Sequence, residues 1–260
     1  MTFSQLKNAH VLITGAGKGI GRAIALELSG YVGQLTLVGR KSESLKEVQS
    51  LIGNQCQVQY VECDISHEET VKRTFQWASQ SFGPVGVLIN NAGQAYSAPF
   101  HKTTLEDWQN MLSVNLTGTF LCTQACIKDM LELPFARVVN IASTASQKGY
   151  PYVSAYTAAK HGVLGLTRSL ALEYAKSPIT FNAICPGFTD TDIVKESLET
   201  ISQKTHLSPE QALMELIKNN PQKRLISPIE IAHQVLSLCH DHSQSINGQA
   251  LSVAGGEVMA

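Results

Sequence analysis

Tyr156 and Lys160 are the two side chains whose types and spacing most directly suggest chemistry. They stand four residues apart in a segment of helical periodicity, so both project from one face of a helix. A tyrosine has an ordinary pKa of about 10, and acid/base work near neutral pH requires a nearby cation that favours the phenolate. Lys160 supplies such a cation. The alternative is a buried aromatic ring beside a lysine whose ammonium reaches solvent.

Ser143 stands thirteen residues before Tyr156 and follows a β-branched run, 138–141, that predicts a strand. At the carboxyl end of that strand its hydroxyl can hold a carbonyl oxygen, so we expect Ser143 to orient this oxygen and Tyr156 to protonate it. A serine hydrolase is a poor alternative, because no Gly-x-Ser-x-Gly segment follows a strand. Residues 239–242, Cys-His-Asp-His, point in different directions at a helix end, and we expect no metal site.

A glycine-rich segment, Thr-Gly-Ala-Gly-Lys-Gly-Ile-Gly, occupies residues 14–21 between a predicted strand and an Ala- and Leu-rich helical segment. Glycines allow a tight turn and a close approach to a pyrophosphate, whose charge the helix amino terminus meets. This context predicts a dinucleotide site rather than an ordinary glycine-rich turn. The residues that we expect to contact the cofactor here are Gly15, Gly17, Lys18, Gly19, Ile20 and Gly21.

The elements that must position these side chains alternate along the whole chain. β-Branched runs predict seven strands, at 11–13, 35–38, 58–61, 87–89, 138–141, 179–184 and 250–253. Segments of helical periodicity predict six helices, near 19–29, 42–52, 67–81, 104–132, 156–176 and 228–240. The alternation predicts a doubly wound α/β fold, with a parallel sheet covered on both faces and one domain over residues 1–260. Residues 192–227 break the rhythm and predict a helical lid over the site.

The glycine spacing, Thr-Gly-x-x-x-Gly-x-Gly, resembles that of the short-chain dehydrogenase/reductase family. Further matches follow in the family's order, namely Asn90-Asn91-Ala92-Gly93, Asn115, Ser143, Tyr156-x-x-x-Lys160 and Pro186-Gly187. The resemblance covers essentially the whole chain. It implies a Rossmann-type fold and an NAD(P)-dependent oxidoreductase that transfers a hydride between the nicotinamide and a carbonyl or secondary alcohol. A cofactor-binding sensor or scaffold without turnover is the alternative from another class.

The resemblance also implies the roles of individual residues. The catalytic set it implies is Asn115, Ser143, Tyr156 and Lys160. In such enzymes the asparagine holds a water on a proton path through the lysine; an amide that bonds a helix backbone is the alternative. Further cofactor contacts that it implies are Asp64, Ile65, Asn91, Ala92, Gly93, Tyr156, Lys160, Pro186, Gly187, Thr189 and Thr191. For Asp64 the alternative is a helix cap.

The end of the second predicted strand bears on which nicotinamide cofactor binds. An acidic residue there binds a ribose 2′-hydroxyl, whereas a cation accommodates a 2′-phosphate. The strand ends Val38-Gly39-Arg40-Lys41, with no acidic residue in place. Arg40, together with Lys18, therefore predicts NADP(H) in preference to NAD(H). The alternative is that Arg40 and Lys41 only end a strand in solvent.

The substrate is indicated by resemblance alone. Residues 140–160, the segment ending at Phe188 and the tail 253–256 resemble 3-oxoacyl thioester reductases and polyketide ketoreductases, whereas the lid resembles 3-hydroxybutyrate dehydrogenases. Those dehydrogenases hold a free carboxylate with a histidine and a lysine, where this chain has Ala145 and Val153. We therefore expect a 3-oxoacyl thioester, with NAD-dependent oxidation of 3-hydroxybutyrate as the alternative. Candidate substrate contacts are Gln94, Gln147, Tyr150, Tyr152, Phe188 and the lid.

Composition limits the remaining partners. The 260 residues carry 20 Lys plus Arg against 21 Asp plus Glu, so no strong field attracts nucleic acid or anionic lipid. No apolar run reaches the roughly 18–20 residues of a membrane span, and the amino terminus lacks the pattern of an export signal. The six cysteines, without a Cys-x-x-Cys motif, are typical of a reducing compartment, and we expect a cytoplasmic protein. The resemblance further implies a homotetramer formed through the long helices.

Overall fold

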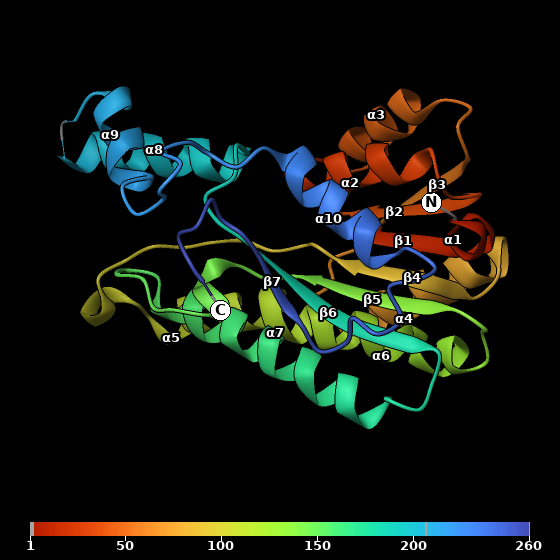
Figure 1. Ribbon diagram of the computed structural model, residues 1–260. Coiled ribbons are helices and arrows are strands. Elements are labelled where there is room, and N and C mark those ends of the chain that lie inside the picture. Colours follow the sequence, from red (N-terminus) through yellow and green to blue (C-terminus); the bar gives the residue numbers. More distant parts are fainter. Residues whose placement is uncertain (1–2, 206, 260) are drawn as a thin grey trace.

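The computed structural model describes residues 3–205 and 207–259 (Figure 1). In this part of the chain seven strands form one parallel sheet with the order β3-β2-β1-β4-β5-β6-β7. The strands are β1 His10–Thr14, β2 Gln34–Gly39, β3 Gln57–Glu62, β4 Val85–Asn90, β5 Ala136–Ile141, β6 Ile179–Pro186 and β7 Ala250–Val253. The strand order reverses between β1 and β4, and such a switch point opens a crevice at the carboxyl ends of the strands. The doubly wound Rossmann-type fold predicted from the sequence is confirmed.

Helices cover both faces of the sheet (Figure 1). On one face lie α2 Gly19–Ser29, α3 Ser42–Ile52 and α10 Pro228–Leu238. On the other lie α4 Glu68–Phe82, α5 Leu105–Leu112, α6 Gly118–Leu131 and α7 Ser154–Glu173. Because both faces are covered, the central strands β4 and β5 are buried along their whole length and carry nearly continuous apolar sequence.

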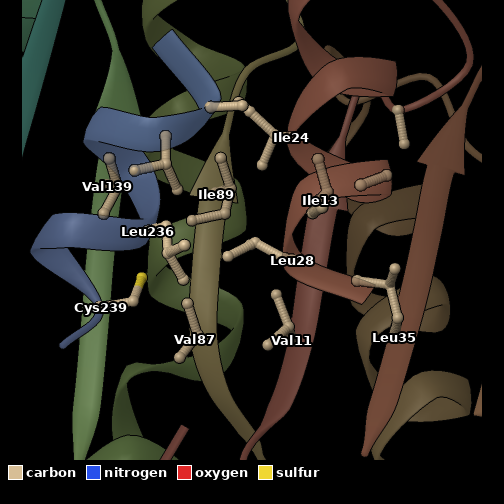
Figure 2. Close-up of a cluster of buried hydrophobic side chains, with 14 of the residues drawn as sticks. Val11, Ile13, Ile24, Leu28, Leu35, Val87, Ile89, Val139, Leu236 and Cys239 are labelled. Atoms are coloured by element: carbon tan, nitrogen blue, oxygen red, sulfur yellow. The ribbon is translucent and has the colours of Figure 1, made fainter. Parts of the chain in front are cut away.

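The core is divided by the sheet into two layers. Figure 2 shows one of them, in which Ile24 and Leu28 of α2 and Leu236 of α10 pack over Ile13 and Val87 of the central strands. The other layer joins α4, α6 and α7 to the opposite side of the same strands, around the fully buried Phe181. Side chains locked in this way hold the carboxyl ends of the strands in fixed positions, and the site is built on those ends.

Two features differ from the elements predicted from the sequence. The helix expected at 104–132 is interrupted by a π-helical segment, η2 Ser113–Thr117, which separates α5 from α6. A short helix, α1 Ser4–Asn8, precedes β1 and was not expected. The other helices and all seven strands lie within a few residues of their predicted positions.

The insertion predicted at 192–227 contains α8 Asp192–Thr205 and α9 Pro209–Leu216, which extend away from the sheet (Figure 1). Its two ends meet, because Thr189 and Ile226 form an isolated parallel bridge. The insertion is thus anchored immediately beyond the end of β6.

None of the helices among the described residues has the length and apolar content needed to cross a bilayer. Within the same residues no three His, Cys, Asp or Glu side chains are grouped so that they could hold a metal ion. All six cysteines are free, and five of them are buried.

Candidate active site

Ser143, Tyr156 and Lys160 converge at the carboxyl end of β5. Ser143 begins the short helix η3 Thr144–Ser146, where its hydroxyl accepts a hydrogen bond of 3.1 Å from the Ala145 amide and bonds to the Tyr156 phenol. Tyr156 and Lys160 both lie in the first two turns of α7, as their spacing predicts. The Lys160 ammonium lies 5.7 Å from the centre of the Tyr156 ring and donates a hydrogen bond of 2.8 Å to the Ile141 carbonyl.

Burial dominates the electrostatics of these groups. It raises the pKa of the Tyr156 phenol, and the hydrogen bond with Ser143 offsets only part of this effect. Burial also lowers the pKa of the Lys160 ammonium to about 8. The expected lowering of the Tyr156 pKa by Lys160 is therefore wrong for this structure, because desolvation of the buried phenol dominates. Tyr156 keeps its proton at neutral pH, which is the state required of a proton donor.

Asn115 lies in the π-helical segment η2 and is buried. Its amide nitrogen donates to the carbonyls of Gln94 (2.9 Å) and Met111 (3.1 Å), and its oxygen accepts from the Gln94 amide at 3.2 Å. A Cβ atom on Gly93 would lie 2.7 Å from that oxygen and 3.7 Å from the Lys160 nitrogen. The structure thus brings Asn115, Gly93 and Lys160 together, and Asn115 braces the loop that follows β4.

The end of β4 also braces the glycine-rich segment. The Thr14 hydroxyl accepts hydrogen bonds of 3.0 Å from the amides of Asn91 and Ala92, and the Asn91 side chain donates to the carbonyls of Thr14 and Gly15. Gly15 has a φ of +66°, and a Cβ atom there would lie 2.8 Å from the Cα of Ala92. A Cβ on Gly21 would lie 2.2 Å from the Gly15 carbonyl oxygen, so neither position accepts a larger residue without movement.

The amino terminus of α2 has the features of a pyrophosphate site. The helix begins at Gly19 after an extended Lys18, without a side-chain cap and without an acidic residue in its first turn. Its first N–H groups therefore retain their capacity to bind an anion. Thr191 faces this turn, since a Cβ on Gly19 would lie 3.1 Å from its methyl carbon. A Cβ on Gly17 would meet the Ser44 hydroxyl of α3, and Ile20 packs against the core.

Arg40 and Asp64 lie near one another at the ends of β2 and β3. Arg40 is exposed, and its charge is felt by the Asp64 carboxyl. Partial burial raises the pKa of Asp64, but hydrogen bonds from Ser66 and the nearby cations together hold it below its ordinary value. Ile65 packs against Gly118 at the start of α6. A dinucleotide whose adenosine end lies here would therefore meet both a cation and a carboxylate.

The turn after β6 is held by its own backbone and by β7. The Gly187 amide donates to the Val253 carbonyl at 3.0 Å, and the Thr189 hydroxyl donates to the Gly187 carbonyl at 2.9 Å. The Thr191 hydroxyl in turn donates to the Thr189 carbonyl at 3.2 Å. Pro186 ends β6, and Thr191 lies against Gly19, so this segment leads from the sheet to the amino terminus of α2.

Among the candidate substrate residues in the described part of the chain, only two come together. Tyr150 and Phe188 come together, with ring centres 6.2 Å apart in an edge-to-face arrangement. Gln94 and Gln147 are engaged elsewhere, Gln94 with the Asn110 carbonyl and Gln147 with the Ser252 hydroxyl. Tyr152 has a φ of +67° and an exposed side chain, and no contact of that side chain with the others is present.

Glu257 and Lys148, which the sequence did not single out, lie directly behind Tyr150. Glu257 pairs with the Lys148 ammonium at 3.0 Å and accepts a hydrogen bond of 2.7 Å from the Tyr150 hydroxyl. Neither residue belongs to a motif, and Glu257 lies 107 residues after Tyr150, so local sequence offered nothing that could have revealed the cluster.

A family model described as short chain dehydrogenase matches residues 9–202. The chain belongs to this family. The short-chain dehydrogenase described here is 36% identical over 254 residues to the 3-oxoacyl-(acyl-carrier-protein) reductase FabG of Aquifex aeolicus, with 97% of this chain and 98% of the relative covered. It is 34% identical to a granaticin polyketide synthase putative ketoacyl reductase of Streptomyces violaceoruber, covering 94% and 91% of the two chains.

Among solved structures, a variant of actinorhodin polyketide ketoreductase with NADPH matches this short-chain dehydrogenase with a TM-score of 0.91. The two are 32% identical, and the match covers 96% of this chain and 98% of the other. These similarities extend over the whole fold. They establish that this chain is a nicotinamide-dependent ketoreductase of the short-chain dehydrogenase family.

Proposed function

We propose that this enzyme reduces the 3-keto group of a 3-oxoacyl thioester to a 3-hydroxyl group with NADPH. The observation that carries the proposal is the convergence of Ser143, Tyr156 and Lys160 at the carboxyl end of β5, with Tyr156 held in its protonated form. The proposed substrate is based on the two relatives named as ketoacyl reductases.

The roles of the side chains follow from their positions. The hydroxyls of Ser143 and Tyr156 together bind the ketone oxygen and orient it. A nicotinamide cofactor, when bound, would supply the hydride for the ketone carbon. Tyr156 gives its proton to the oxygen, which yields the alcohol and leaves a phenolate next to the Lys160 ammonium. Lys160, with a pKa of about 8, can then return a proton to Tyr156 near neutral pH.

The preference for NADP(H) is supported by Arg40. Its exposed guanidinium follows β2 directly, with Gly39 before it and no acidic side chain at that point of the sequence. Lys18 contributes a second cation; its 3.8 Å contact with Asp192 joins two exposed groups, and such a surface pair is worth little. A 2′-phosphate could therefore recruit both cations at low cost.

A thioester is favoured over a free acid by the charges around the substrate side. Ala145 and Val153 are uncharged where the 3-hydroxybutyrate dehydrogenases hold a carboxylate. Lys148, the cation nearest in sequence to Ser143, is already paired with Glu257. A free carboxylate would thus be desolvated without a counter-ion from these positions, which is unfavourable.

The proposal is tested by measuring kcat/KM for 3-oxoacyl thioesters, free 3-hydroxy acids and simple ketones, each with both cofactors. We expect the thioesters with NADPH to be preferred. Preferential oxidation of free 3-hydroxybutyrate with NAD would contradict both the substrate and the cofactor.

The Tyr156→Phe variant tests catalysis itself. We expect turnover to fall by at least about 100-fold, the contribution of general acid catalysis, while the dissociation constant of NADPH stays within about twofold. An unchanged turnover would show that Tyr156 is not the proton donor, and a wild-type protein that binds NADPH without reducing any of these ketones would favour a sensor.

A further inference from the structure

The tail after β7 carries a buried carboxylate next to the candidate active site. The side chain of Glu257 is 2% exposed, and it contacts the Lys148 ammonium at 3.0 Å and the Tyr150 hydroxyl at 2.7 Å. A carboxylate in the interior is stable only when charges and hydrogen bonds compensate its lost hydration. Glu257 meets this condition through residues that belong to the segment after Ser143.

The hydrogen bonds of this cluster have defined donors and acceptors. Tyr150 has one hydroxyl hydrogen, and the carboxylate of Glu257 can only accept, so Tyr150 donates to Glu257. The Tyr150 oxygen must then accept the hydrogen of Thr144, whose hydroxyl is 2.7 Å away. Burial and the bond to Glu257 raise the pKa of Tyr150, which keeps this phenol neutral. The chain therefore runs from Thr144 through Tyr150 to Glu257.

The cluster lies between the two segments that flank the substrate side. Thr144 follows Ser143 directly, and the Tyr150 ring packs against Phe188, which follows Gly187. A Cβ on Gly187 would lie 3.6 Å from the second carboxylate oxygen of Glu257. The Tyr150 hydroxyl is thus fixed from behind, while its ring forms part of a wall with Phe188.

The same tail also contacts the base of the lid. The Ser252 hydroxyl of β7 bonds to Gln147 at 2.9 Å, and a Cβ on Gly255 would lie 2.4 Å from the Asn220 side-chain oxygen. The tail therefore joins the Ser143 segment to the residues that follow α9. Any loss of the Glu257 contacts would loosen the wall formed by Tyr150 and Phe188.

The pairing of Lys148 with Glu257 indicates that Glu257 also affects which substrates bind. Its side chain is 34% exposed, and its ammonium lies 4.8 Å from the centre of the Tyr150 ring. Without Glu257 this ammonium would be an unpaired cation a few residues from Ser143. The carboxylate thus withholds from the substrate side a charge that would attract anionic ligands.

We propose that Glu257 is a positioning and specificity-determining residue, which fixes the Tyr150–Phe188 wall for a neutral acyl thioester and, by neutralising Lys148, disfavours free 3-oxo acids. This inference rests on the proposed ketoreductase function. It adds a residue of the tail that acts through its contacts with Tyr150 and Lys148.

The test is the Glu257→Gln variant, which keeps the shape but replaces the carboxylate that holds the Tyr150 hydroxyl and pairs with Lys148 by a neutral amide, so the charge-assisted bond to Tyr150 is lost. We expect KM for a 3-oxoacyl thioester to rise about tenfold, the loss associated with a hydrogen bond to a charged group, with kcat within about twofold. We expect KM for the free 3-oxo acid, measured beside it, to fall. Adding Lys148→Met should abolish the gain for the free acid.

Tyr150→Phe is the matched variant, because it removes only the hydroxyl through which Glu257 acts on the wall. It should raise the thioester KM as Glu257→Gln does, and the double variant should be no worse than either alone. If Glu257→Gln does not fold, Tyr150→Phe provides the test by itself. An unchanged thioester KM in Tyr150→Phe would then overturn the proposal.

Two further results would also overturn it. One is that Glu257→Gln changes kcat and KM by the same factor, and does so equally for the thioester and the free acid. The other is that the preference of Glu257→Gln between thioester and free acid is the same as that of the wild type. A wild-type enzyme inactive on every ketone with either cofactor would instead overturn the proposed function, so the two failures are distinguishable.

Discussion

Lys160 holds a buried positive charge that the fold does not compensate with a carboxylate among its described contacts. The residue is 5% exposed, and its pKa is lowered to about 8 because burial disfavours the ammonium. The ordinary value is near 10.5. This difference corresponds to about 3 kcal/mol of lost stability when both folded and unfolded states are protonated. A residue that destabilises the fold to this extent is expected where catalysis requires it.

The Lys160→Met variant should therefore lose activity and gain stability that depends on pH. Between pH 8 and 10.5 the unfolded wild-type chain binds more protons at this residue than the folded chain, so wild-type stability from this group rises with pH. The advantage of Lys160→Met should be greatest below pH 8 and should shrink by about 3 kcal/mol as pH rises toward 10.5. Urea denaturation of both proteins from pH 7 to 10 measures this difference.

The exposed Lys176 offers a control, because Lys176→Met removes a charge that the fold does not bury and should bring no comparable gain in stability. A difference between Lys160→Met and wild type that stays constant over this range would mean that the Lys160 pKa is not lowered by the fold.

At this same scale the sequence predicted the positions that motifs mark and missed those that long-range packing creates. Ser143, Tyr156 and Lys160 could be predicted from the sequence because helical spacing and a preceding strand bring them together. The direction in which the Tyr156 pKa shifts could not be predicted, since it depends on burial by the surrounding fold. Glu257 could not be predicted either, because its partners are distant in sequence and only the tail's path places it behind Tyr150.

Among the elements, the junction of β1 and α2 is the most tightly constrained. The Gly15 carbonyl lies where a side chain on Gly21 would begin, and the Asn91 amide fills the remaining space. The turn therefore depends on two glycines and on a brace from β4. This geometry holds the amino terminus of α2 toward the expected pyrophosphate.

Gly21→Ala should displace this junction. A Cβ atom 2.2 Å from the Gly15 oxygen cannot be accommodated without moving the backbone, so we expect a loss of about 1–3 kcal/mol, the usual range for overpacking. NADPH affinity should fall at least about tenfold, because the N–H groups that we expect to bind the phosphates would shift. Chemical denaturation and fluorescence titration with NADPH measure the two effects.

Gly30 at the other end of α2 provides the matched control. Its φ is −74°, and a Cβ there would meet its nearest atoms at 3.9 Å, so Gly30→Ala should leave NADPH binding intact and stabilise the fold by about 0.4–1 kcal/mol. Wild-type NADPH affinity in Gly21→Ala would show that the glycine-rich turn does not carry the cofactor.

Elements with strong periodicity were predicted well, and those fixed by tertiary contacts were not. The alternation of buried strands and amphipathic helices specified the sheet. The π-helical segment at 113–117 was missed because helical periodicity over a long segment does not distinguish a single π-helical turn from the α-helices on either side of it. The short helix α1 was missed because it depends on Asp241, which accepts hydrogen bonds from Ser4 and Gln5 across the length of the chain.

For the molecule as a whole, large apolar side chains are exposed on both α6 and α7. Phe120 on α6 is 42% exposed and Leu172 on α7 is 81% exposed, and both helices cover the same face of the sheet (Figure 1). Large apolar side chains exposed on neighbouring elements favour contacts between proteins. We propose that a second copy of this chain covers these helices, in keeping with the homotetramer expected from the family resemblance.

Leu172→Glu should weaken such an assembly, because each copy would bury an unpaired carboxylate in a symmetric interface. The matched control is Leu51→Glu: Leu51 is 49% exposed on α3, on the opposite face of the sheet. Size-exclusion chromatography with light scattering should give a mass near four chains for wild type and Leu51→Glu, and a smaller mass for Leu172→Glu. A wild-type mass of one chain, or an unchanged mass in Leu172→Glu, would contradict association through α7. Because Tyr156 and Lys160 lie at the other end of that helix, dissociation with retained kcat would further show that the active site is complete within one chain.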